Sequence, residues 1–480
     1  MALQTGQPSP FTLSPRDRER FAAHVREAGR RARRHRPDGV LAAVTVRLPQ
    51  ALDPSAIVAV SRRAGEPWFC FERPDRDGQA LAALGCVEAF DERGPGRFAA
   101  VARSWRRTVA DAACDQAEGP RGAGVVAVGG FAFAPEGGTA PHWAGFPAGS
   151  MHVPEVALVR RDGDVRLTFA ALVGPDDSPE AVVSRLDARV AELRSTPLPL
   201  LDPDPAGRVR VVGTMPPEHY EAAVARGVER IRAGDLEKIV LAREVQVHAS
   251  APHDPAAVFG VLRDAFPSCH VFCVGRGDSA FVAASPELLI RRDGMRAGTV
   301  ALAGSTRRSA DPAVDDHLAE QLLRSDKDRG EQAIVTRRIE RALQPLSLWV
   351  TTAQEPVIVK VANIQHLATP IRAQLAQRAS AVELAGLLHP TPAVGGEPHV
   401  KAAPLIPALE GLDRGWYAGP VGWTDAGEDG EFCVALRCAL VTGPVARCYA
   451  GVGVVRDSDP AAELAETEVK LQALLPVLAI

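Results

Sequence analysis

The sequence predicts an α+β fold with antiparallel sheets. Strand-like and helix-like segments mix along the chain without the steady strand–helix–strand rhythm of a parallel α/β protein. The 480 residues, 46% of them hydrophobic and 24% charged, are enough for one large enzyme fold or for more than one domain. An extended, proline-rich run at 196–205 indicates a change of region near residue 205, which divides the chain into 1–205 and 206–480.

The first half is expected to begin with a charged helix over 15–36, which stops at the turn sequence Pro37-Asp38-Gly39. The basic run at 30–36 has no supporting basic or stacking residues elsewhere, which favours a solvated helix face over a nucleic-acid site. A second helix is expected over 178–195. Short strands are expected over 44–48, 68–72, 125–133 and 165–171.

The second half is more regular. Tyr220, Val224, Val228 and Ile231 recur at helical spacing, and Gly234 closes that helix. The alternating pattern over 238–247 then predicts a strand. Further elements are expected in this order: one long charged helix over 315–343, strands with turns within 421–455, and a final helix over 458–475.

Several classes of protein are disfavoured. The net charge of −4 gives no overall attraction to nucleic acid or to an anionic membrane. No apolar stretch approaches the roughly 20 residues that span a bilayer, and the first 20 residues lack a signal-peptide centre, so a cytoplasmic protein is expected. The 8 cysteines form no CxxC pair and are interpreted as buried thiols, among them Cys433, Cys438 and Cys448. Phosphate-loop, dinucleotide, zinc-protease and nucleophile-elbow motifs are missing.

Two residues suggest acid–base chemistry. Lys238 opens a strand, and an amine drawn into an apolar sheet can act as a base. The plain alternative is an edge lysine that reaches water. Glu287 ends an apolar segment, where a carboxyl can stay protonated and act as a general acid. Its alternative is an ordinary charge at the end of a strand or helix.

A second group suggests a metal. Glu463, Glu466 and Lys470 follow one face of the final helix, and paired carboxylates suit Mg²⁺. A surface Glu–Lys pair explains the same spacing. Glu331 is the candidate partner ligand, with a solvated helix face as its alternative. Taken one at a time, none of these residues establishes a function.

The order and wording of the motifs from Lys238 onward resemble the chorismate-utilising enzymes, a family that includes isochorismate, salicylate, anthranilate and aminodeoxychorismate synthases. The resemblance covers nearly all of 213–480. The matching blocks lie at 238–244, 284–289, 301–308, 325–331, 366–369, 389–396, 414–423, 437–439, 449–455 and 458–470. The first half resembles, more weakly, the variable N-terminal half of longer, menaquinone-type members, for instance at 129–133.

The resemblance implies the fold of this family, with large antiparallel sheets packed as a sandwich and flanked by helices. It implies chorismate as the substrate, Mg²⁺ as the cofactor and no obligatory protein partner. By the same matching, Lys238 is the general base and Glu287 the general acid. Glu331 and Glu466 are then the magnesium ligands, with Glu463 nearby through water.

The substrate-binding residues also follow from the resemblance. Arg437 and Lys470 are similar to the cations that hold the substrate carboxylates. Gly304 and Gly453 fall where backbone amides approach the ligand, which requires a residue without a side chain. His366 matches a histidine that lines the site, and a packed structural histidine is its alternative.

The loop 389–399 bears on the subclass. Isochorismate synthases resemble this loop, with Ala393 and a closing Pro398-His399, whereas aminating and salicylate-forming members usually have threonine at the first position and a Pro-Lys ending. Lys238 fits a water nucleophile, although aminodeoxychorismate synthases also carry a lysine there. Hydration without further elimination is therefore expected.

Three rival functions stay open: a salicylate synthase, an aminating synthase and a non-catalytic chorismate binder. The long first half favours a menaquinone pathway over siderophore biosynthesis. Three residues depart from the family pattern, namely Asp326, Gln332 and Glu397. Gln332, which stands where many members have histidine, bears on the support of the metal.

Overall fold

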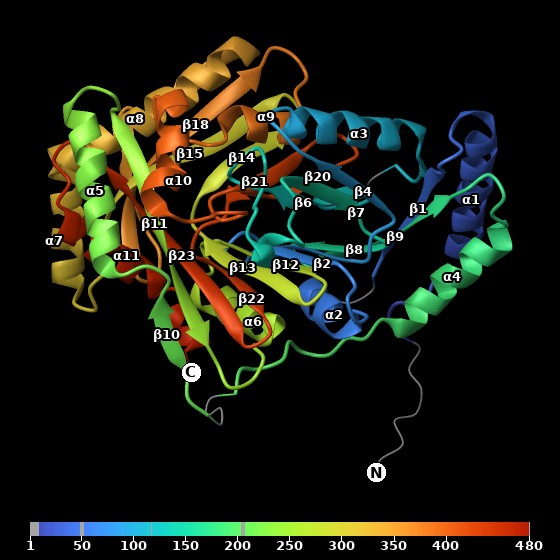
Figure 1. Ribbon diagram of the computed structural model, residues 1–480. Helices are drawn as coiled ribbons and strands as arrows, with labels where there is room; N and C mark the ends of the chain where they lie inside the picture. Colours follow the sequence, from blue (N-terminus) through green and yellow to red (C-terminus); the bar gives the residue numbers. More distant parts are fainter. Residues whose placement is uncertain (1–8, 49–51, 117, 203–206, 480) are drawn as a thin grey trace.

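The computed structural model describes residues 9–48, 52–116, 118–202 and 207–479. Its strands form two large sheets, and Figure 1 shows helices around the outside of both. The predicted α+β class with antiparallel sheets is confirmed, because every strand pair except the short pair β1–β5 is antiparallel within these residues. The predicted change of region near residue 205 lies at 203–206, outside the described residues.

The larger sheet, sheet A, has 13 strands in the part of the chain that the structure describes. In spatial order they are β10 (Arg210–Gly213), β11 (Lys238–His248), β23 (Val445–Val454), β22 (Cys438–Thr442), β13 (Ser279–Ser285), β12 (His270–Arg276), β2 (Trp68–Arg73), β3 (Gln79–Leu84), β8 (Val156–Arg161), β9 (Asp164–Val173), β1 (Val40–Arg47) and β5 (Ala113–Cys114), with β19 (Gly396–Glu397) also paired to β11.

The smaller sheet, sheet B, has 10 strands among the described residues. In spatial order they are β16 (Ser347–Thr352), β18 (Ile364–Leu375), β15 (Arg296–Arg307), β14 (Leu288–Asp293), β21 (Gly430–Val434), β20 (Pro420–Asp425), β6 (Val126–Phe131), β7 (Gly149–Val153) and β4 (Glu88–Glu92), with β17 (Val357–Lys360) also paired to β18.

The helices lie outside the sheets (Figure 1). They are α1 (Pro15–His35), α2 (Pro54–Ser61), α3 (Arg97–Asp111), α4 (Pro179–Glu192), α5 (Pro217–Arg232), α6 (Pro255–Ala265), α7 (Pro312–Arg324), α8 (Asp326–Leu343), α9 (Ala381–Leu388), α10 (His399–Glu410), α11 (Pro460–Leu471) and α12 (Leu475–Leu478). In the described residues, no helix is long and apolar enough to cross a membrane.

The main core lies between the two sheets. Because successive side chains of a strand point to opposite faces, Phe272 and Val274 of β12 face this core together with Phe432 of sheet B. Val271 and Cys273 of the same strand pack on the other face, in a second core with residues of α2 and α6. Sheet A is therefore covered on both faces.

Both halves of the chain contribute to both sheets. In sheet A, β12 pairs with β2, and in sheet B, β20 pairs with β6. In each sheet the strands from before residue 205 form one block beside the strands from after it, and the two blocks meet at the pairs β2–β12 and β6–β20.

Most predicted elements are found, with shifted ends. The strands predicted at 44–48, 68–72, 125–133 and 165–171 are β1, β2, β6 and β9, and the helix over 178–195 is α4. The single helix predicted over 315–343 is wrong. The chain forms α7 and α8 instead, because Ser325 takes an extended conformation with φ −70° and ψ 113° and its side chain caps α8 by accepting from the Asp328 N–H.

One minor prediction changes in part. Cys433, Cys438 and Cys448 are buried as expected, but Cys86 is exposed and Cys114 is half-buried, because they lie in or beside connections between elements. The basic run at 30–36 was predicted to be a solvated helix face, and Arg30, Arg33, Arg34 and His35 are exposed, as expected. Arg30 pairs with Glu27 on this surface, and Arg36, just after α1, donates to Asp111 at 3.0 Å.

Candidate active site

Antiparallel pairing brings the predicted site residues to one end of sheet A. The neighbours β11, β23, β22 and β13 run in alternating directions, so the start of one strand lies beside the end of the next. Lys238 begins β11, Gly453 is near the end of β23, Arg437 precedes β22, and Glu287 follows β13. Residues far apart in the sequence therefore meet at one edge.

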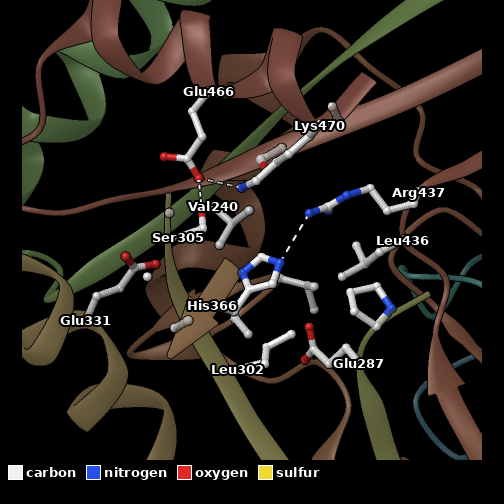
Figure 2. Close-up of a pocket in the computed structure, with 18 of the residues that line it drawn as sticks. Val240, Glu287, Leu302, Ser305, Glu331, His366, Leu436, Arg437, Glu466 and Lys470 are labelled. Atoms are coloured by element: carbon white, nitrogen blue, oxygen red, sulfur yellow. Dashed lines mark hydrogen bonds and ion pairs between the residues drawn. The ribbon is translucent and has the colours of Figure 1, made fainter. Parts of the chain in front are cut away.

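A cavity lies at this edge, bounded by sheet A, sheet B and the helices α8 and α11 (Figure 2). Ten of the predicted site residues line it: Glu287, Gly304, Glu331, His366, Ala393, Arg437, Gly453, Glu463, Glu466 and Lys470. Lys238 lies directly behind this wall, with its Nζ atom 2.8 Å from Oε1 of the cavity-lining Glu331.

Lys238 is fully buried, so the alternative of an edge lysine that reaches water does not hold. Its side chain passes Gly453 on the neighbouring strand. A Cβ atom at Gly453 would lie 2.7 Å from Lys238 Cε and 2.1 Å from Glu331 Oε1. The absence of a side chain at this position therefore allows the amine of Lys238 and the carboxylate of Glu331 to meet.

Glu287 is also buried, and its main chain is fixed by two hydrogen bonds. Its N–H donates to Ser285 Oγ at 3.3 Å, and its carbonyl accepts from the Val434 N–H at 3.0 Å. Burial raises the pKa of Glu287 to about 7, against the opposing effect of Lys238, Arg437 and Lys470. Near neutral pH the carboxyl group can therefore hold a proton.

Carboxylates from two helices gather on the opposite side of the cavity (Figure 2). Glu466 on α11 accepts from Ser305 Oγ at 2.6 Å and pairs with Lys470 at 2.8 Å. Burial opposes its charge, but Lys470, Ser305 and Lys327 lower the pKa of Glu466 to about 2. Glu463 pairs with Lys327 at 2.7 Å, although burial raises its pKa.

The carboxylates are balanced by lysines in this arrangement. Glu331 faces Lys238 and Glu463 faces Lys327, and in the part of the chain that the structure describes no three acidic, histidine or cysteine side chains converge as a ready metal site. The donor chemistry of Glu331, Glu463 and Glu466 nevertheless suits a hard cation such as Mg²⁺. One oxygen of Glu331 and one oxygen of Glu463 are bound by these lysines, so a metal ion would compete for them or bind through the other oxygen.

Arg437 and His366 are joined by a dashed line in Figure 2. Arg437 Nη2 lies 3.4 Å from His366 Nε2. Burial, Arg437 and Lys470 lower the pKa of His366 to about 3, so its ring is neutral at physiological pH. Arg437 has a φ of 49°, an uncommon conformation for a residue with a side chain that is often retained at functional sites.

Gly304 lies at an irregularity of β15, where the register with β18 shifts between Ala303 and Ser305. Its φ is +71°, and a Cβ atom there would lie 3.0 Å from Asp328 Cβ. The glycine allows the strand to bulge and turns Ser305 toward Glu466, with which it forms its hydrogen bond.

The three departures from the family pattern lie outside the cavity lining. Gln332 is buried, and its Nε2 atom donates to Ala301 O and Thr369 Oγ1, both at 2.9 Å. Glu397 faces Arg338 at 3.8 Å, and Asp326 is in the first turn of α8. His399 begins α10 and does not line the cavity.

Several lining residues were missed by sequence reasoning. Ser305 and Lys327 bind the predicted acids, and the rings of Tyr417 and Tyr449 stack with their centroids 5.2 Å apart. All four belong to the matching motif blocks, so membership of a block was the available signal. Nothing in their spacing distinguishes them from core or surface residues.

The cavity combines buried cations, carboxylates, a neutral imidazole and a carboxyl group that titrates near neutral pH. Such a site suits a small, anionic substrate and proton transfer, as in an enzyme that works without a covalent nucleophile. The family model described as chorismate binding enzyme matches residues 25–479, and the chain belongs to that family.

Individual relatives agree with this assignment. A salicylate biosynthesis isochorismate synthase from Pseudomonas aeruginosa is 35% identical over 427 residues, which cover 89% of this chain and 88% of that protein. The isochorismate synthase MenF of Bacillus subtilis is 35% identical over 355 residues, 74% of this chain and 75% of that protein. Among solved structures, the menaquinone-specific isochorismate synthase MenF from Escherichia coli has a TM-score of 0.77 at 27% identity, covering 92% of this chain and 95% of that one.

Proposed function

We propose that this protein is a magnesium-dependent isochorismate synthase, which converts chorismate to isochorismate. The observation that carries the proposal is the placement of a buried amine, Lys238, directly behind the wall of a cavity that the protonatable carboxyl group of Glu287 lines. Ala393 in the cavity wall and the isochorismate synthases among the relatives support the same subclass.

The proposed reaction exchanges one hydroxyl position for another. Lys238 takes a proton from a water molecule whose oxygen forms a bond to ring C2. The double bonds shift, the C4–O bond breaks, and Glu287 gives its proton to the departing hydroxyl group. One water is consumed and one is released, and the cycle closes when the proton on Lys238 returns to Glu287 through solvent, so no redox cofactor is needed. Arg437 and Lys470 hold the substrate carboxylates, and neutral His366 lines the site without adding charge.

The charged residues around the cavity support the proposal that a magnesium ion binds there. Asp328, Glu331, Glu463 and Glu466 line the space into which a substrate with two carboxylates must enter. Because the neighbouring lysines already pair with these acids, little of their positive charge is left to attract the substrate carboxylates. A further cation in the cavity would therefore favour substrate binding. We propose Glu331 and Glu466 as direct Mg²⁺ ligands, with Glu463 acting through water. The bound ion would neutralise and orient a substrate carboxylate.

A menaquinone pathway is the proposed context. It is supported by the long first half and by the coverage of the menaquinone-specific structure over 92% of this chain. The Pseudomonas aeruginosa relative, which is named for salicylate biosynthesis, makes siderophore-type pathways the alternative. Neighbouring genes for menaquinone enzymes would support the first, and neighbouring genes for catechol or salicylate siderophores would contradict it.

The base is tested by Lys238→Ala. We expect turnover of chorismate to be lost while the far-ultraviolet circular dichroism spectrum is kept. Wild-type-like turnover would contradict the assignment. The nearest rival, a salicylate synthase, would release pyruvate and salicylate from chorismate, and an aminating synthase would require ammonia for its product.

A further inference from the structure

One edge of strand β11 lacks a neighbouring strand along part of its length. Its first residues pair with β19, where Lys238 faces Glu397, and the Val240 N–H donates to Gly395 O at 2.7 Å. Its last residues pair with β10, beginning at Val245. Between these two neighbours, the carbonyl of Val240 and the N–H of Ala242 on this edge need other partners.

A buried ion pair supplies these partners. Arg414 Nη2 donates to Val240 O at 3.0 Å, and the Ala242 N–H donates to Glu410 Oε1 at 2.7 Å. Arg414 and Glu410 are 4% exposed each, and they bind one another through two hydrogen bonds. The ion pair therefore replaces a strand on the edge of β11, two residues beyond Lys238.

Arg414 also forms a hydrogen bond to a residue of the cavity wall. Its Nη1 atom donates to Val394 O at 2.7 Å, and both Val394 and its neighbour Ala393 line the cavity. One planar guanidinium group thus joins the strand that carries Lys238 to the loop that carries Ala393. The fork geometry of arginine suits this task, because its donors lie on separate nitrogen atoms, whereas all three donors of a lysine lie on one.

A residue from the first half of the chain, Phe133, also contacts Arg414. The guanidinium group of Arg414 lies over the ring of Phe133, 4.3 Å from its centroid. The main chain of Phe133 is fixed on both sides, since its N–H donates to Gly415 O at 2.8 Å and its carbonyl is 3.0 Å from His389 Nε2. Phe133 is therefore held between Arg414 and the start of the 389–396 loop.

We propose that Arg414, paired with Glu410, is a positioning residue that holds the 389–396 loop against strand β11 together with the direct hydrogen bond from the Val240 N–H to Gly395 O, and so fixes the Ala393 wall relative to Lys238. Arg414 does not line the cavity, so it acts through the residues it binds. The consequence for turnover rests on the proposed function, whereas the consequence for the loop does not.

The main test is Arg414→Lys, which keeps the charge beside Glu410 but cannot bridge both carbonyls. The matched control is Arg189→Lys, because Arg189 is fully buried against Glu66 and Glu192 and lies outside the active-site cavity. The double variant Glu410→Gln/Arg414→Gln removes both buried charges together. It provides a folded comparison if Arg414→Lys does not fold.

Two readouts are combined. Hydrogen exchange followed by mass spectrometry reports on the loop peptide 389–397, and steady-state kinetics with chorismate report on kcat and KM. In Arg414→Lys and in the double variant we expect about tenfold faster exchange of the loop and a loss of kcat/KM of about 10-fold to 100-fold. Arg189→Lys is expected to stay within about twofold of wild type in both.

The proposal is overturned if loop exchange in the Arg414 variants equals that of wild type, or if exchange rises while kcat and KM do not change. An equal loss in Arg189→Lys would also overturn it, because general destabilisation would then explain the effect. If the wild-type protein itself does not turn over chorismate, the proposed function fails. The exchange comparison then still decides whether Arg414 holds the loop.

Discussion

Replacing Glu287 by glutamine should stabilise the fold at alkaline pH while abolishing catalysis. Glutamine has nearly the shape of the protonated carboxyl group and carries no charge. In the folded protein, burial raises the pKa of Glu287 from an ordinary value of 4.5 to about 7. The folded state therefore binds this proton more tightly than the unfolded state. Below about pH 4.5 both states are protonated, and the pKa difference has no cost.

The charge of Glu287 lowers the free energy of unfolding as the pH rises from about 4.5 to about 7, because the unfolded state releases the proton first. Above about pH 7 the cost is constant, at about 3 kcal/mol for a pKa difference of about 2.5. Glu287→Gln removes this cost. Its free energy of unfolding should therefore exceed that of wild type by up to about 3 kcal/mol at pH 8, and by almost nothing at pH 4.5.

The assay is urea unfolding followed by tryptophan fluorescence, in EDTA, at several values of pH between 4.5 and 8.5. The urea midpoint of Glu287→Gln should move away from that of wild type across this range, without a change in slope. A difference between the two midpoints that does not depend on pH would refute the assignment of a raised pKa to Glu287. Glu237→Gln, at an exposed carboxylate, is the control and should show little pH-dependent difference.

Other predictions concern the site itself. Since Glu287 must be protonated to act as the acid, kcat/KM for chorismate should fall about tenfold per pH unit above about pH 7; a flat profile up to pH 9 would contradict this role. Gly453→Ala would place Cβ 2.1 Å from Glu331 Oε1 and should lower kcat/KM about 100-fold with an unchanged circular dichroism spectrum, whereas retained activity would contradict the close packing. Ala393→Thr should slow isochorismate formation, as measured by chromatography, and Ala393→Gly should not. Equal rates for the two variants would contradict a role for the size of this side chain in the reaction.

Much of the secondary structure was predictable, because it depends on local patterns. Helix α5 follows from four apolar residues at helical spacing, and β11 follows from alternation after a glycine. The break between α7 and α8 was missed, because the extended conformation and cap at Ser325 compete with a helix-forming context on both sides.

The sheet order was not predictable from the sequence. The pairing of β12 with β2 joins Val271 to Glu72, and no local pattern encodes a contact over that separation. The same holds for the order β11–β23–β22–β13, which assembles the candidate site. The motif blocks named most of the site residues, but not the contacts of Ser305, Lys327 and Arg414, because those depend on how the strands are arranged.

The most direct test of the central claim is product analysis by chromatography after incubation of the purified protein with chorismate, with and without Mg²⁺. We expect isochorismate in equilibrium with chorismate, formed only when Mg²⁺ is present and without pyruvate. Salicylate with pyruvate would contradict the proposed subclass. No product with Mg²⁺, even with ammonia supplied, would contradict the proposed activity.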